Sequence, residues 1–166
     1  AQDFLGLQYF LSYGLDIVRL RPFNHIGEGQ RIGFVVPDFV KQIVEIEKSG
    51  KPGEIVVGNL EAVRDFTDVL DMVSAYELAL MKGEAGEVYN VGSGKGVKIS
   101  YLLDQLVKMS KAKIKITVDK SRFRPGEPSQ LICNPDKFMQ ATGWKPEIPL
   151  EKTLERVLEW WRKEIR

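Results

Sequence analysis

Residues 87–110 read EVYNVGSGKGVKISYLLDQLVKMS, and this stretch decides the class of fold. The run Glu87–Val91 is rich in β-forming residues and predicts a strand. Ser100 predicts the N-cap of a helix that runs to about Ser110. Gly92–Gly96 lies between these two elements and is typical of a turn. A strand, a glycine-rich turn and a helix in succession indicate an α/β protein.

The glycine run also invites comparison with a phosphate-binding loop, because it follows a strand and precedes a helix. It contains neither the Gly-x-x-x-x-Gly-Lys-Ser/Thr spacing nor a Gly-x-Gly-x-x-Gly followed by an acidic residue after a second strand. We therefore predict a plain turn at this position.

Short extended runs and helical periodicities alternate along the rest of the chain. Leu60–Thr67 is expected to be a connecting segment that leads to the helix near Asp68. Ser121–Pro128 is expected to be a loop with two prolines. We predict strands at 15–20, 54–57 and 113–118, a short extended piece at 131–133, and helices at about 4–13, 37–48, 68–82, 134–142 and 150–165. The fold class is α/β, with short strands alternating with helices, in a single domain that spans 1–166.

The composition is that of an ordinary globular protein, with 43% hydrophobic and 28% charged residues among 166 and a formal net charge of +1. This balance gives no general attraction to nucleic acid or to an anionic membrane, and no run approaches the length of a membrane span. One cysteine, Cys133, allows no internal disulfide, and with a single histidine, His25, we expect no metal site. The first residues lack a signal peptide, so we expect a cytoplasmic protein.

The first helix has no capping residue ahead of it and ends at Tyr13, with Gly14 suited to the C-cap. Its apolar side chains lie on more than one side, which is typical of a helix buried on two faces. We expect this helix to be cut in its middle.

Several polar residues stand where strands end. Pro22 cannot continue a strand ladder, so Arg21–Asn24 is expected to leave the strand at 15–20 as a loop, at the edge where ligands lie in open α/β sheets. Asn24 either binds a phosphate or sugar oxygen or ties down its own backbone. His25 is interpreted as a structural, hydrogen-bonded residue.

Arginines form the second group of candidates. Arg64 either pairs with Asp65 or Asp68 at the surface or binds a diphosphate through its guanidinium fork. Arg124 and Glu127 share a loop stiffened by two prolines, and both are either simply solvated or suited to nucleotide recognition.

Five motifs occur in an order that resembles the C-terminal half of the extended short-chain dehydrogenases/reductases, the NAD-dependent epimerase/dehydratase family. The branch that the chain is most similar to contains GDP-4-dehydro-6-deoxy-D-mannose reductase and GDP-mannose 4,6-dehydratase. The motifs are RPFNHIGEGQ at 21–30, GNLEAVRDFTDV at 58–69, YNVGSG at 89–94, RPGEP at 124–128 and TGWKP at 142–146.

The resemblance implies a fold and a set of roles. The chain would be the substrate-binding part of such an enzyme, with 1–24 and 86–94 as remnants of its Rossmann domain. The implied partner is a GDP-sugar, and the intact protein would be a homodimer that uses NADP or NAD, which this chain alone would not bind tightly. The implied substrate-binding residues are Asn24, Val35, Asp38, Phe39, Asn59, Arg64, Arg124 and Glu127, and those near the nicotinamide are Pro22, Phe23 and Asn24.

The same resemblance implies that catalysis lies elsewhere. Members of the family carry a glycine-rich dinucleotide loop and a Tyr-x-x-x-Lys pair, and Ala1 is expected to follow directly after that Lys. Tyr9, in the first helix, is followed four residues later by Tyr13 and not by Lys. We therefore expect no catalytic residue and no oxidoreductase activity in this chain alone.

Three interpretations stay open at this point. The first is part of a GDP-sugar reductase, with a 4,6-dehydratase or C4 epimerase as its close alternative. The second is a nucleotide-sugar binding module without chemistry. The third is an interaction protein that docks through the helix at 4–13. The residues do not separate NADP from NAD.

Overall fold

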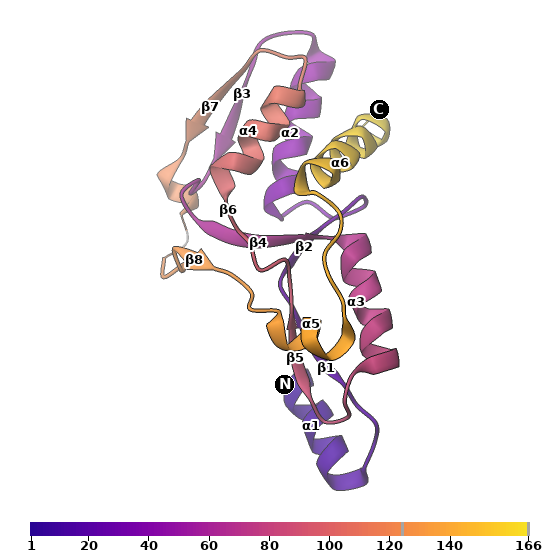
Figure 1. Cartoon of the computed structure of the whole chain (residues 1–166). Coiled ribbons are helices and arrows are strands. Elements are labelled where there is room, and N and C mark those ends of the chain that lie inside the picture. Colours follow the sequence, from indigo (N-terminus) through magenta and orange to yellow (C-terminus); the bar gives the residue numbers. More distant parts are fainter. Residues whose placement is uncertain (124, 166) are drawn as a thin grey trace. The chain divides into compact units, whose positions relative to one another are not determined.

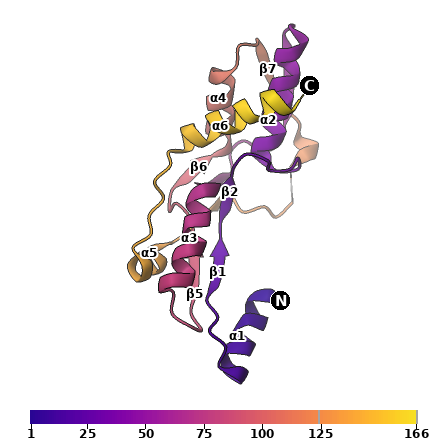
Figure 2. The ribbon, with the colours of Figure 1, turned by 90° about the vertical axis from the view of Figure 1, so that its right-hand side faces the viewer.

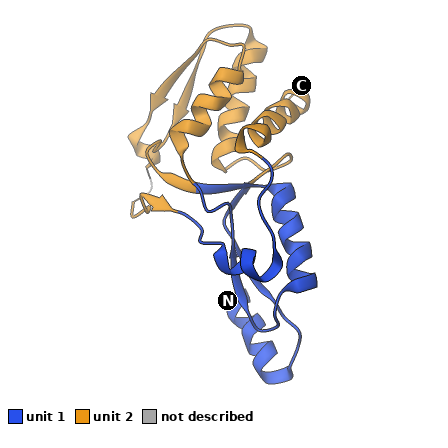
Figure 3. Cartoon of the chain, in the orientation of Figure 1, with its two compact units in different colours: residues 1–25, 65–95, 132–148 blue, residues 26–64, 96–131, 149–166 orange. Residues whose placement is uncertain are grey.

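The computed structural model describes residues 1–123 and 125–165, and the chain forms two compact units (Figure 3). Unit 1 is built from the segments 1–25, 65–95 and 132–148. Unit 2 draws its described residues from the segments 26–64, 96–131 and 149–166. Each unit is therefore assembled from three separate pieces of the sequence.

Unit 1 has a pair of parallel strands at its centre. Strand β1 (Arg19–Pro22) pairs with β5 (Val88–Val91), in a register that runs from Arg19 opposite Val88 to Pro22 opposite Val91. The helices of this unit are α1 (Gln2–Tyr13), α3 (Val69–Lys82) and α5 (Asp136–Thr142), drawn in Figure 1. Because two parallel strands point the same way, their C-terminal ends lie at one edge of this pair.

An aromatic cluster forms the core of unit 1. The ring centroids of Tyr89 and Phe138 are 5.6 Å apart, and those of Phe138 and Trp144 are also 5.6 Å apart. The indole Nε1 of buried Trp144 donates to the Asp71 carbonyl at 3.1 Å and to the Ser74 hydroxyl at 3.0 Å. Trp144 therefore fastens the 142–146 motif to α3.

Unit 2 contains a second parallel pair and three helices. Strand β3 (Gly53–Val57) pairs with β7 (Ile114–Val118) from Gly53 opposite Ile114 to Val57 opposite Val118. Helices α2 (Val35–Ser49), α4 (Ile99–Met109) and α6 (Leu150–Glu164) pack against one another, as both ribbon views show (Figures 1 and 2). A short 3-10 helix, η1 (Lys120–Arg122), follows β7. Apolar residues that these three helices bury include Val40, Ile43, Val44, Leu102, Leu103, Leu106, Leu154 and Val157.

The remaining strands are short. They are β2 (Asn24–Ile26), β4 (Val63–Asp68), β6 (Gly96–Lys98) and β8 (Gln130–Leu131). Their order is β2-β4-β6, and β8 pairs in parallel with β4, with Val63 opposite Gln130 and Arg64 opposite Leu131. None of the helices in the described part of the chain is long and apolar enough to cross a membrane.

The predicted class, α/β with short alternating elements, is confirmed, but the first strand was misplaced. It begins at Arg19, not Leu15, and it includes Pro22. The amides of Arg19 and Phe23 donate to the Glu87 and Val91 carbonyls of the neighbouring segment at 3.0 and 2.8 Å. Since alternate residues of a strand present their amides to the same side, the missing N–H of Pro22 faces away from β5 and breaks no bond of this pair.

Strand β4 was missed, because the segment 60–67 was expected to be a connection. Its sequence contains Arg64 and Asp65, and charged residues are depleted in strands. The structure accommodates Asp65 by hydrogen bonds, as described below. Strands β2 and β6, of three residues each, were also missed.

Helices α1 and α2 begin about two residues before their predicted starts, at Gln2 and Val35, and the starts of α4 and α5 also differ from the prediction. Helix α4 begins at Ile99 after Lys98, and Ser100 is not its cap, because the amides of Ile99 and Ser100 donate to the Ala62 and Leu60 carbonyls, each at 3.0 Å. Helix α5 begins at Asp136, two residues after Asn134, whose side chain accepts from the Asp136 amide at 3.0 Å. The predicted end of α1 at Gly14 is confirmed, with φ of 65°.

Candidate functional site

The C-terminal edge of the β1–β5 pair carries Pro22, Phe23 and Asn24 in unit 1. Phe23 is half-buried and its amide is held by the Val91 carbonyl, while the side chains of Pro22 and Asn24 are exposed. His25 follows, with its Nδ1 3.2 Å from the Phe23 carbonyl. The three residues that the resemblance assigns to the nicotinamide are consecutive at this edge, and Asn24 lies in β2 and not in a loop.

The same edge carries the Gly92–Ser93–Gly94 bend, and Asp65 holds it. Asp65 is fully buried, and its carboxylate accepts from the amides of Ser93 and Gly94 at 3.0 and 2.8 Å and from the Ser93 hydroxyl. Gly92 has no room for a side chain, since a Cβ there would lie 2.6 Å from the Cβ of Cys133. The bend is therefore shaped by one buried carboxylate and a close backbone approach.

Asp65 is a residue whose role the sequence analysis missed. It was considered only as a surface partner of Arg64, and that interpretation is wrong. Successive residues of a strand point to opposite faces, so Arg64 and Asp65 cannot face each other on β4. The signal that was available is a carboxylate within a β-rich run, which predicts either a break or a buried, hydrogen-bonded acid.

Cys133 lies against this carboxylate. Its amide donates to Asp65 Oδ2 at 3.2 Å, and its side chain is buried. Burial, with a smaller contribution from the Asp65 charge, raises the pKa of the Cys133 thiol to about 12. Cys133 therefore acts as a small buried side chain and not as a reactive thiolate.

In unit 2, Arg64 and Glu127 form an ion pair. Arg64 Nη2 donates to Glu127 Oε1 at 2.8 Å, and Nη1 donates to the Val63 carbonyl at 2.8 Å. The Arg64 side chain is 12% exposed and that of Glu127 is 29% exposed. The pairing of β4 with β8, together with the Val63 amide donating to the Ser129 carbonyl at 2.8 Å, brings the loop that carries Glu127 beside Arg64. The alternative partner Asp68 instead caps α3 by accepting from the Leu70 amide at 2.8 Å.

A turn and a short helix stand at the C-terminal edge of the β3–β7 pair. Asn59 follows β3, and its side chain accepts from the Glu61 amide at 3.0 Å, so it shapes its own turn. Arg122, in η1, donates to the Val56 carbonyl at 2.6 Å. A Cβ on Gly58 would come within 3.3 Å of the Arg122 backbone and side chain, which explains the glycine at this crossing.

The predicted base-pocket segment begins helix α2. Val35 and Asp38 are half-buried, whereas Phe39 is buried in unit 2. The carboxylate of Asp38 accepts from the Gly33 amide at 2.8 Å and so holds the loop that leads into the helix. Among these three, Val35 and Asp38 keep side-chain surface for a ligand.

Two further predictions concern Arg124 and metal ligands. Arg124 lies outside the described residues. Within residues 1–123 and 125–165, no group of three or more His, Cys, Asp or Glu side chains is placed to hold a metal ion.

Two parallel strand pairs and alternating strands and helices are the architecture of a class, the C-terminal part of an extended short-chain dehydrogenase/reductase. Residues 1–157 match the model of the family described as GDP-mannose 4,6 dehydratase. The chain belongs to that family, and the resemblance predicted from its motifs is confirmed.

Individual relatives agree with this family. The chain is 36% identical to a GDP-6-deoxy-D-mannose reductase of Pseudomonas aeruginosa, over 100% of its own length and 55% of the relative. It is 28% identical to a dTDP-D-glucose 4,6-dehydratase of Mus musculus, over 93% of its own length and 43% of the relative. The chain therefore spans about half the length of the curated relatives that it matches.

Solved structures show the same fold. The structure of RMD from Pseudomonas aeruginosa complexed with NADPH superposes with a TM-score of 0.92 and 36% identity, covering 98% of this chain and 54% of that one. A UDP-glucuronic acid 4-epimerase from Bacillus cereus, in complex with UDP-glucuronic acid and NAD, gives a TM-score of 0.84 and 27% identity, covering 97% of this chain and 50% of that one. The chain corresponds to one half of each of these enzymes.

Proposed function

We propose that this chain is the GDP-sugar-binding portion of an NAD(P)-dependent GDP-4-dehydro-6-deoxy-mannose reductase. The observation that carries the proposal is the Arg64–Glu127 pair, a guanidinium fixed beside a carboxylate on the loop between β7 and β8. The 36% identity to a GDP-6-deoxy-D-mannose reductase along the whole chain supports the choice of substrate class.

The chemistry of the pair suits a nucleoside diphosphate. The two bonds from Arg64 to Val63 and Glu127 use one N–H of each terminal nitrogen and orient the planar fork. The remaining N–H groups can then donate to two phosphate oxygens at once. Glu127 keeps a second carboxylate oxygen that can accept from ribose hydroxyls. A cation already held in place loses less conformational entropy when the diphosphate binds.

Other residues take the roles that the family implies. Arg124 shares the diphosphate with Arg64, Asn24 contacts the substrate near the diphosphate, and Val35 and Asp38 line the base pocket. Asn59 and Phe39 act indirectly, because Asn59 shapes its turn and Phe39 belongs to the buried side of α2.

The cofactor, NADP or NAD, would meet this chain at Pro22, Phe23 and Asn24. The fit rests on the β1–β5 edge, where the glycine bend at 92–94 brings only backbone and a serine close to the strand ends. Bound there, the cofactor would supply hydride. The family's Tyr-x-x-x-Lys pair does not occur among these 166 residues, so we propose no acid or base group on them.

Two alternative functions are compatible with the same binding residues. A 4,6-dehydratase or C4 epimerase would use the same binding residues with different catalytic groups. A binding module without chemistry would bind the GDP-sugar and nothing more. The homodimer and the cytoplasmic location also stay predictions.

Thermal unfolding with GDP, UDP and dTDP at millimolar concentration tests the proposal. A ligand at about 100 times its dissociation constant stabilises by roughly 2.7 kcal/mol, which is an easily measured shift. We expect a shift with GDP that is larger than with UDP or dTDP and that is lost in Arg64→Ala.

Arg156→Ala is the matched control, because Arg156 forms a comparable pair with Glu28, its Nε lying 2.8 Å from Oε1. Equal shifts in Arg64→Ala and the wild type would contradict the role of Arg64. No shift with any nucleotide, in this chain and in a protein extended at its N-terminus, would contradict the function.

A further inference from the structure

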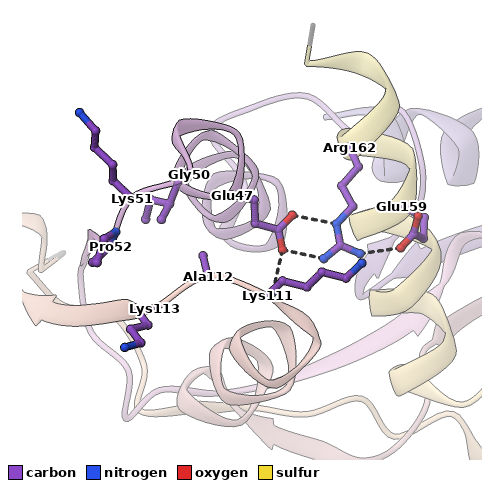
Figure 4. A pocket seen from close by; sticks show the side chains of 10 residues that line it. Glu47, Gly50, Lys51, Pro52, Lys111, Ala112, Lys113, Glu159 and Arg162 are labelled. Carbon is purple, nitrogen blue, oxygen red and sulfur yellow. Dashed lines mark hydrogen bonds and ion pairs between the residues drawn. The ribbon is translucent and has the colours of Figure 1, made fainter.

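A second concave site lies in unit 2, away from the residues assigned to the nucleotide. It is a pocket of about 640 Å³ between the end of α2, the turn at 50–52, the loop at 111–113 and the last turns of α6 (Figure 4). Pockets that hold small organic molecules have volumes of about 300–1,000 Å³. Neither the family roles nor the proposed function uses this pocket.

One wall of the pocket is fixed by a charge network around Arg162. Arg162 Nε and Nη2 donate to the two carboxylate oxygens of Glu47 at 2.8 and 2.6 Å, and Nη1 donates to Glu159. Glu47 also accepts from the Ser110 hydroxyl at 2.8 Å and the Lys111 amide at 3.2 Å. The carboxylates that line the pocket are thus engaged by Arg162, and α2, α6 and the loop after α4 are tied together.

Three lysines in the lining, Lys51, Lys111 and Lys113, are exposed, and their ammonium groups have no carboxylate within ion-pair distance among the described residues. Exposed lysines elsewhere do have such partners, for example Lys98 with Glu61 at 3.0 Å and Lys152 with Glu155 at 3.0 Å. The pocket therefore carries uncompensated positive charge.

Apolar groups complete the lining. Ile46, Pro52 and Ala112 contribute to it, and Ile46 lies so close to β3 that a Cβ on Gly53 would be 2.5 Å from its side chain. The glycine at position 53 lets the isoleucine take this place. A ligand for this pocket combines an apolar body with a strongly anionic group.

We propose that this pocket binds an organic phosphate, whose dianionic group is attracted by the excess positive charge of the lining and whose apolar body lies on Ile46, Pro52 and Ala112. Lysine is a point-charge phosphate binder that needs no fixed geometry. A dianion matches the excess charge better than a carboxylate does. The C-terminal ends of α2 and α4 carry partial negative charge, which explains a lysine just beyond each helix, at Lys51 and Lys111. The helix ends do not explain Lys113.

Amide NMR of the 15N-labelled chain, titrated with phenyl phosphate, tests the proposal. We expect saturable shifts of the Lys51, Ala112 and Lys113 amides. Inorganic phosphate should bind at least several-fold more weakly because it lacks the apolar body, and phenol, which lacks the charge, should leave these amides unchanged. Benzoate separates a general anion site from a phosphate site, and binding as tight as that of phenyl phosphate would contradict the phosphate assignment.

Charge-removal variants identify the lysines. Lys51→Gln/Lys113→Gln is expected to weaken phenyl phosphate binding about tenfold. The control Lys41→Gln/Lys145→Gln removes the same charge from two lysines outside the pocket lining and should bind like the wild type. A dispersed spectrum shows that each variant is folded. Absent saturable shifts, or equal affinities in both double variants, would overturn the proposal without bearing on the GDP site, since its residues are different.

Discussion

The helices of the two units differ in how much of their apolar surface they bury. In unit 2, α2, α4 and α6 bury apolar faces against one another, with Val40, Leu106 and Leu154 completely inaccessible. In unit 1, α1 buries no residue, and Leu11 is 68% exposed; on α3, Leu80 is 87% exposed. Unit 2 has a closed helical core, whereas the core of unit 1 is the aromatic cluster around Phe138.

This contrast indicates where stability and interaction reside. Burial of a leucine side chain contributes roughly 1.5–3 kcal/mol, so the buried leucines of α4 and α6 contribute a large share of the stability of unit 2. Exposed apolar side chains that gather on a surface mark interaction sites. Arg64 and Glu127, which we propose bind the nucleotide, belong to unit 2.

The largest expected difference between the units comes from leucine truncation. Leu106→Ala should lower the free energy of unfolding by about 2–5 kcal/mol, because it opens a cavity in the unit 2 core. Leu11→Ala in α1 should change it by less than about 0.5 kcal/mol. Urea unfolding followed by circular dichroism measures both, and equal losses would break the comparison.

The buried Asp65 carboxylate is expected to stabilise unit 1. Asp65→Asn places an NH2 group where backbone amides now donate, so we expect a loss of roughly 2–3 kcal/mol. Asp16→Asn, at an exposed position in the same unit, should have little effect. If both variants unfold at the same urea concentration as the wild type, Asp65 does not hold the 92–94 bend.

Acid should weaken unit 2 through Glu47. Hydrogen bonding from Arg162 holds the pKa of the Glu47 carboxyl below its usual 4.5. A lowered folded-state pKa means that the stabilisation is complete above about pH 4.5 and is lost as the pH falls through the lower value.

Glu47→Gln should therefore lower the free energy of unfolding by about 1 kcal/mol at pH 7 and flatten the loss of stability as the pH falls below about 4.5. Glu45→Gln, which removes an exposed partner of Lys41, is the control. Parallel acid curves for Glu47→Gln and the wild type would show that the network contributes nothing to acid stability.

A chemical readout of unit 1 is the alkylation of Cys133. Because burial raises the pKa of its thiol to about 12, the folded chain should react with iodoacetamide at pH 8 about a hundredfold more slowly than the urea-unfolded chain. Comparable rates, followed by mass spectrometry, would mean that unit 1 opens around this residue.

Strong local signals made most of the fold predictable. Helical periodicity located α6 to within about a residue, Gly14 located the end of α1, and the runs at 54–57 and 113–118 were indeed strands. The failures lie where tertiary contacts override local preference. Strand β4 keeps charged residues because Asp65 finds four hydrogen-bond donors, and the start of α4 is satisfied by the backbone of residues 60–62.

The candidate site was only partly predictable. The motifs named Arg64 and Glu127 separately, but the β4–β8 pairing that brings them to 2.8 Å is a long-range contact that no local pattern contains. The pocket at Lys51 and Lys113 joins turns about 60 residues apart in sequence, and its lysines look like ordinary surface charge in the sequence.

The most direct test of the central claim is the amide spectrum of the labelled chain titrated with GDP. The account predicts saturable shifts at Gly58, Arg64, Glu127 and Leu131, which disappear in Arg64→Ala and are absent at Lys113. Amide shifts that are confined to the lysine pocket, or that are unchanged in Arg64→Ala, would contradict the proposal that the nucleotide binds beside Arg64 and Glu127.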